Sequence, residues 1–140
     1  MGATLDLGRG IEAEAELAVR KVEAGADFLI SQPIFDPDDA HRFRDSYERQ
    51  GGSPLAVPVF FGLQILEQGG VLFSSVPDSV RAELDAGRSS VDIAVGLYGR
   101  FREAGLNDVY LMPPIRRGGA RDYGAAREFF RRLVSQLPSI

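Results

Sequence analysis

The side chains best suited to chemistry follow short apolar runs that end at prolines. The clearest is Gln32, which closes the run of residues 28–31 directly before Pro33. Its amide can donate and accept hydrogen bonds at once, which suits recognition of the lactam edge of a heterocycle. A glutamine at the end of a strand can also serve only to cap the backbone. Position and residue type therefore leave a substrate-binding role and a structural role open.

A second candidate is the arginine-rich segment that follows the run at residues 109–112. Arg116, Arg117 and Arg121 surround the pair Gly118-Gly119. Residues 111–140 hold six arginines against two acids, a local charge of +4, whereas the preceding 110 residues carry −8. Guanidinium groups bind phosphates and carboxylates bidentately, so this loop is a candidate anion site. The later arginines of the segment are expected to form the solvated face of a helix.

Other charged residues have simpler explanations. Arg20 and Lys21 stand near the end of a predicted helix, where cations complement the helix dipole. His41, the only histidine, is expected in solvent. The acids of segment 36–39 lack the Gly and Glu spacing of an EF-hand and fit the start of a helix.

Several classes of site are excluded by composition. The chain has no cysteine, so it has no disulfide, thiolate zinc site, iron–sulfur cluster or Cys nucleophile. A metal site would have to be built from carboxylates, and we predict none. The GxGxxG, Walker A, HExxH and GxSxG motifs are also missing.

Hydrophobic periodicity predicts the elements that position these residues. Apolar spacing of three and four predicts helices, and short continuous apolar runs predict strands buried on both faces. The last helix is expected to begin at Asp122 with Ala126, Phe130, Leu133 and Leu137 facing inward. The predicted order is αβαβααβα, with helices at 12–24, 36–50, 75–86, 89–104 and from 122, and strands at 28–32, 56–63 and 109–112.

An internal similarity supports this order. Residues 23–34 and 103–115 both read as a helix end, a tight turn, a short strand and a proline. Repeated αβ units require right-handed crossovers and a sheet covered by helices, which indicates a doubly wound sheet or part of a (β/α)8 barrel. A whole barrel takes about 250 residues and eight strands, so three strands fit only part of one.

Length and charge favour one folded domain over residues 1–140. The net charge of −4 argues against nucleic acid and anionic membranes as partners. No apolar run reaches the roughly 18 residues of a membrane span. The first residues show neither a basic n-region nor an apolar h-region, so a cytoplasmic location is expected.

One long motif resembles a known family. Residues 20–36 read RKVEAGADFLISQPIFD, which is similar to the segment R-K-V-x-A-G-A-x-x-x-x-T-Q-x-x-F-D of methylenetetrahydrofolate reductases. The strand that ends near Gly62, the Val76-Pro77 helix start and the strand at Val109 follow in the family's order. The resemblance implies a (β/α)8 barrel that holds FAD and uses NAD(P)H to reduce methylenetetrahydrofolate to methyltetrahydrofolate in one-carbon metabolism and methionine biosynthesis.

The resemblance also implies roles for single residues. Gln32 is similar to the glutamine that hydrogen-bonds the folate pterin, and Arg116 to an arginine that contacts substrate after the last strand. Glu14, Arg20 and Lys21 correspond to residues that face the flavin. The three predicted strands resemble the family's sixth, seventh and eighth, and the family's acidic proton donor lies upstream of them, so no catalytic residue is assigned.

Two main hypotheses follow, and a third, another flavin- or phosphate-binding barrel, stays open because a fold does not fix its chemistry. In the first, the chain is the carboxyl-terminal part of a methylenetetrahydrofolate reductase-like barrel, with little activity alone and with the other strands supplied by a complementary chain or a longer gene product. In the second, it is a non-enzymatic α/β half-barrel that forms a homo-oligomer to cover its open sheet edges. The sequence leaves the choice between NADH and NADPH open.

Overall fold

The computed structural model describes residues 1–67, 69–70 and 76–135. Within them the chain forms one parallel sheet and a layer of helices. The elements are β1 (Gly2–Leu5), a 3-10 turn η1 (Leu7–Arg9), α1 (Ile11–Glu23), β2 (Phe28–Pro33), α2 (Pro37–Gly51), β3 (Val59–Gln64), α3 (Asp78–Asp85), α4 (Ser90–Glu103), β4 (Val109–Met112) and α5 (Tyr123–Ser135).

The four strands are parallel and stand side by side in chain order, β1-β2-β3-β4. The prediction of three strands is therefore wrong by one, because β1 was missed. Its sequence, GATL, is short and contains only one large apolar residue, so it lacks the continuous apolar run of a buried strand. As an edge strand it needs less apolar surface than its neighbours.

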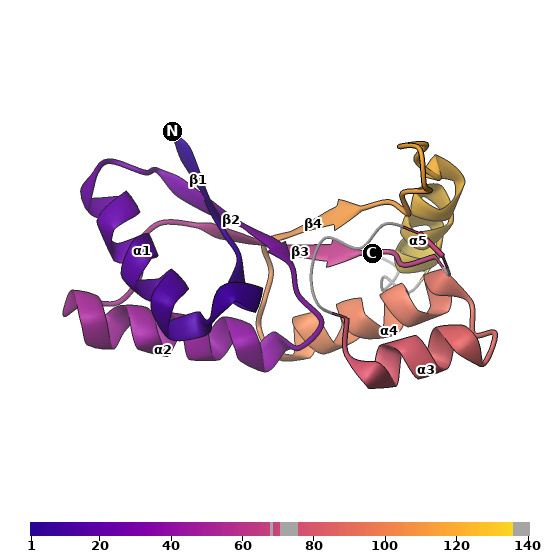
Figure 1. Ribbon diagram of the computed structural model, residues 1–140, viewed down its shortest axis with the longest axis horizontal. Helices are drawn as coiled ribbons and strands as arrows, with labels where there is room; N and C mark the ends of the chain where they lie inside the picture. The colour runs from indigo at the N-terminus through magenta and orange to yellow at the C-terminus, as the bar shows by residue number, and fades with distance from the viewer. Residues whose placement is uncertain (68, 71–75, 136–140) are drawn as a thin grey trace.

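Helices cover one face of this sheet. Figure 1 shows α1, α2, α3 and α4 on the same side of the strands, with α5 beside α4. Leu5, Leu29, Phe61 and Leu63 point into this layer and are fully buried. Ile30, which alternates with Leu29 along β2, is 37% exposed, because no described helix covers the other face of the sheet.

Local signals set the helix boundaries as expected. The Asp36 carboxylate accepts a hydrogen bond from the Asp38 amide, and Pro37 occupies the first turn of α2. The helix ends at Gly52, whose φ of 81° is one that favours glycine. Ser89 caps α4, because its hydroxyl accepts a hydrogen bond from the Asp92 amide. Ala15 and Ala18 are buried on the face of α1 that packs on the core.

Two further predictions need correction. On α5, Phe130 is 54% exposed while Phe129 is 2% exposed, so the predicted inward face is wrong at this position. Phe129 packs edge-on against Tyr98 of α4 at 5.9 Å, and two consecutive helical residues cannot both face the same neighbour. Leu137 lies outside the described residues.

The second predicted strand begins later than expected. It starts at Val59 because Pro58 cannot donate to a ladder. The Pro58 carbonyl nevertheless accepts the Leu29 amide at 2.9 Å, so the proline borders the sheet. No helix among the described residues is long and apolar enough to cross a membrane.

Candidate functional site at the strand ends

The carboxyl end of β2 carries the predicted binding residue Gln32. The residue is half-buried, and its backbone carbonyl accepts a hydrogen bond from the Ser31 hydroxyl at 2.8 Å. Ser31 is itself buried, and its Oγ accepts the backbone amide of Gly62 on β3 at 3.1 Å. Gln32 is therefore tied to β3 through the side chain of its neighbour.

A third strand reaches the same point. The Tyr110 hydroxyl on β4 donates to the Ser31 carbonyl at 2.5 Å. Burial raises the pKa of Tyr110 above its usual 10.0, so the hydroxyl keeps its proton at neutral pH. Strands β2, β3 and β4 thus meet in one hydrogen-bonded cluster of Ser31, Gly62 and Tyr110. No local sequence pattern predicts this cluster as a whole, although a glycine inside an apolar strand is a known sign of a close approach.

The other predicted substrate residue, Arg116, lies in a turn after β4 and is 59% exposed. Its Nε lies 3.3 Å from Glu67 Oε2, and one of its terminal nitrogens lies 3.6 Å from Asp122 Oδ2. A bridge between Ile115 and Arg121 closes the turn. Arg116 is therefore flanked by two carboxylates, and an anionic ligand would compete with both.

The residues expected to face a flavin lie on α1, near β1. Glu14 is 3% exposed, and its Oε1 accepts the Asp6 amide at 3.2 Å. Its Oε2 is buried without a hydrogen-bond partner in the described part of the chain. Arg20 pairs with Glu16 on the helix surface at 2.7 Å. Lys21 Nζ donates to the Thr4 carbonyl of β1 at 2.6 Å.

The structure does not gather all the predicted residues into one pocket. Lys21 lies beside β1, Gln32 ends β2, and Arg116 follows β4 at the other edge of the sheet. A small pocket of about 150 Å³ opens where β1 and β2 end, with Gly8, Pro33 and Phe35 in its wall. Another, of about 220 Å³, lies beside Glu67, the partner of Arg116.

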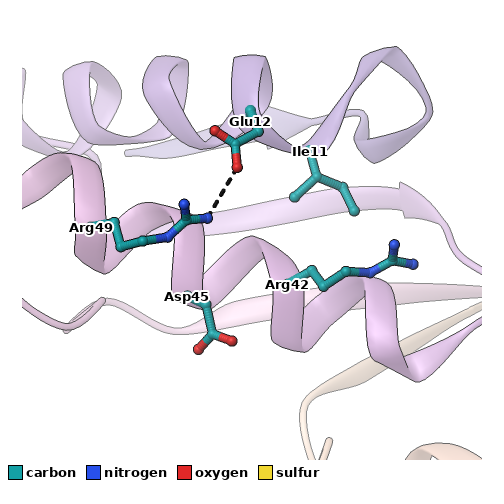
Figure 2. Close-up of a pocket in the computed structure, with 5 residues that line it drawn as sticks. All are labelled: Ile11, Glu12, Arg42, Asp45 and Arg49. Carbon is teal, nitrogen blue, oxygen red and sulfur yellow. Dashed lines mark hydrogen bonds and ion pairs between the residues drawn. The ribbon is translucent and has the colours of Figure 1, made fainter.

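The pocket drawn in Figure 2 lies elsewhere, between α1 and α2, and has a volume of about 490 Å³. Arg49 and Glu12 form an ion pair of 3.0 Å across it, and Arg42 and Asp45 complete its charged wall. All four charges stand in the helix layer, away from the strand ends. Position and internal pairing make this pocket a poor candidate for catalysis.

His41 and Asp36 lie where the sequence predicts them, since His41 is exposed on α2 and Asp36 caps that helix. Among the described residues, no group of three or more His, Cys, Asp or Glu side chains is arranged to hold a metal ion.

Together, a parallel sheet in chain order, helices on one face and polar residues at the strand ends define an α/β protein consistent with part of a (β/α) barrel. Sequence comparison gives the family. The sequence model of methylenetetrahydrofolate reductase matches residues 9–84, more than half of the chain, and the chain belongs to this family. The match confirms the resemblance, and it contains Glu14, Arg20, Lys21 and Gln32 but not Arg116.

Comparison of structures supports the same fold. An uncharacterized protein from Clostridium thermocellum, described as binding two copies of 5-methyl-5,6,7,8-tetrahydrofolic acid, superposes with a TM-score of 0.64 at 15% sequence identity. The alignment covers 97% of this chain and 54% of that one, so this chain spans about half the length of the matched structure. No curated protein matches the sequence.

Proposed function

We propose that the chain is the reduced-folate-binding part of a methylenetetrahydrofolate reductase-like barrel. The observation that supports this most strongly is the family match over residues 9–84, which includes Gln32 at the carboxyl end of β2. Ligands of barrels bind at these strand ends. The folate bound by the matched structure agrees with the same ligand class. In this proposal the Gln32 amide donates to and accepts from the pterin ring.

The strand count bears on where the chain would lie in the proposed barrel. If β2, β3 and β4 correspond to the sixth, seventh and eighth strands, then β1 takes the fifth place. The described strands would be the second half of an eight-stranded barrel. The first four strands and the family's proton donor would come from a complementary chain or a longer gene product.

The charged side chains of Glu14, Arg20 and Lys21 on α1 are chemically suited to FAD. Arg20 and Lys21 would hold the diphosphate, because guanidinium and ammonium groups donate charge-assisted hydrogen bonds to phosphate oxygens. They would exchange their present partners, Glu16 and the Thr4 carbonyl, for the ligand. Glu14 Oε2, a buried acceptor without a partner in the described region, would accept from a hydroxyl group. When bound, the flavin supplies the hydride-transfer chemistry between NAD(P)H and the folate. Glu14 also holds the turn between β1 and α1 through the Asp6 amide.

Binding of 5-methyltetrahydrofolate to the purified chain, measured by isothermal titration calorimetry, tests the folate proposal. Gln32→Met keeps the length of the side chain and removes both amide bonds. We expect about tenfold or greater weakening, since each bond contributes roughly 0.5–1.5 kcal/mol. Gln50→Met, on α2, is the control and should leave the affinity unchanged. Absence of binding, or equal affinity for wild type and Gln32→Met, would refute the proposal.

Cofactor binding needs its own test. Titration of the chain with FAD, followed by flavin fluorescence, should show uptake that Lys21→Met weakens. Oxidation of NAD(P)H should stay at background for the chain alone and rise when the missing strands are supplied. Flavin-dependent oxidation of NAD(P)H by the chain alone would contradict this part of the proposal.

Self-association as a non-enzymatic half-barrel is the second candidate. The exposed side chain of Ile30 favours it, and so do β1 and β4, which are the two edge strands of the sheet in the described part of the chain. Sedimentation equilibrium separates the two candidates. A stable homodimer that takes up neither folate nor FAD supports self-association, and a monomer that binds folate supports the barrel part.

A further inference from the structure

The end of β2 contains an irregularity that places Gln32. The Leu29 and Ile34 amides donate to the Pro58 and Gly62 carbonyls at 2.9 and 3.0 Å. The two donors are five positions apart, in β2 and directly after it, whereas their acceptors are four positions apart, directly before β3 and in it. One extra residue is therefore inserted in β2, within the register shift between Ile30 and Pro33. Gln32 lies inside this β-bulge, and bulges redirect side chains next to binding sites.

Ser31 repairs the ladder at the bulge. In a regular ladder the Gly62 amide would donate to a β2 carbonyl. Here it donates to the Ser31 hydroxyl at 3.1 Å, and that hydroxyl donates in turn to the Gln32 carbonyl at 2.8 Å. One side chain thus satisfies the orphaned amide of β3 and fixes the peptide group of Gln32.

Tyr110 holds the carbonyl that the bulge releases. Its hydroxyl reaches the Ser31 carbonyl from β4, across the intervening strand β3. The phenol passes over Gly62, its register partner, so closely that a Cβ at position 62 would lie 2.6 Å from the hydroxyl oxygen. A glycine at this position is what lets the tyrosine cross the strand.

We propose that Tyr110 and Ser31 are positioning residues for folate recognition: together they lock the bulge of β2 so that Gln32 presents its amide in one orientation. The inference rests on the proposed role of Gln32. Tyr110 holds the Ser31–Gln32 peptide group through the Ser31 carbonyl. The Ser31 hydroxyl holds the Gln32–Pro33 peptide group through the Gln32 carbonyl, so both peptide groups that flank the Gln32 Cα are fixed. Loss of either hydroxyl frees that segment without removing any group that touches the ligand.

A double-mutant cycle tests the coupling. Tyr110→Phe removes only the hydroxyl, and we expect it to weaken 5-methyltetrahydrofolate binding about five- to tenfold, because the freed segment must then be ordered when the ligand binds. In the Gln32→Met background the same change should alter affinity less than twofold. Tyr98→Phe, on α4, is the matched control and should have no effect. An equal loss in both backgrounds would show a merely structural role and overturn the inference.

A ligand-free measurement separates this inference from the proposed function. In ¹⁵N NMR spectra, the Gln32 side-chain amide should show lower order in Tyr110→Phe and in Ser31→Ala than in the wild type. The Gly62 amide should exchange with solvent about tenfold faster in Ser31→Ala. A chain that binds no folate but shows these changes refutes the folate proposal and retains the positioning role. An unchanged Gln32 side chain overturns the positioning role.

Discussion

Gly62→Ala is the sharpest test of the packing at the strand ends. The new Cβ would lie 2.6 Å from the Tyr110 hydroxyl oxygen, 2.8 Å from its Cζ and 3.1 Å from the Pro33 Cα. Overpacking of this kind costs about 1–3 kcal/mol, and displacement of Tyr110 adds about 1 kcal/mol for its hydrogen bond to Ser31. The substitution also lowers the conformational entropy of the unfolded chain, which offsets about 0.5–1 kcal/mol of this cost. We expect a net loss of about 1–3 kcal/mol in the free energy of unfolding.

The comparison variant is Gly99→Ala on α4. A Cβ at Gly99 meets nothing within 4 Å, so the substitution should stabilise the helix by about 0.5–1 kcal/mol. Urea denaturation followed by circular dichroism gives both values. In a Tyr110→Ala background, the cost of Gly62→Ala should shrink, because only the Pro33 contact remains. A cost of Gly62→Ala that is below about 0.5 kcal/mol, or equal in both backgrounds, would refute the reasoning.

Three further outcomes follow from described contacts. In urea denaturation, Phe129→Ala should lower the free energy of unfolding by about 3–5 kcal/mol, whereas Phe130→Ala should change it by no more than about 0.5 kcal/mol. Similar losses in the two variants would contradict the assigned face of α5. Burial raises the pKa of Tyr110, so the unfolded chain loses this proton first. The contribution of this group to the free energy of unfolding should be fully present below pH 10 and should be lost as pH rises toward the pKa of Tyr110 in the folded chain. Urea denaturation repeated across alkaline pH should therefore show a less steep loss in Tyr110→Phe than in the wild type. Lys21→Met removes the hydrogen bond to the Thr4 carbonyl, and the free energy of unfolding should fall by roughly 0.5–1 kcal/mol in thermal denaturation. An unchanged free energy of unfolding would show that this bond does not stabilise β1.

Most of the fold could be predicted from the sequence because its local signals agree. Asp36 and Pro37 start α2, and a continuous apolar run identifies β2. β1 could not be predicted in this way, because an edge strand of small residues carries no apolar run and is stabilised by pairing with β2. The prediction of the inward face of α5 was wrong at Phe130, because Phe129 and Phe130 are equally apolar and only contact with α4 distinguishes them.

The candidate site was predictable where it depends on position along a strand. Gln32 could be placed at the end of β2 from the run that precedes it. The cluster of Ser31, Gly62 and Tyr110 could not, because it depends on a one-residue bulge and on contacts between residues up to 79 positions apart. Likewise, the carboxylates beside Arg116 come from a turn and from the loop after β3, which no local pattern brings together.

Under the proposed function, the cluster would also connect folate binding with completion of the barrel. Phe61 and Leu63 point into the helix layer, so a Cβ at Gly62 points to the uncovered face of the sheet, and the Tyr110 hydroxyl lies beside it. Whatever covers this face, missing strands or a second copy, buries the bond between Tyr110 and the Ser31 carbonyl. Exclusion of water strengthens such a bond and so holds Gln32 more firmly. By linkage, a complementary half that raises folate affinity by this route is itself bound more tightly, by the same factor, when folate is present.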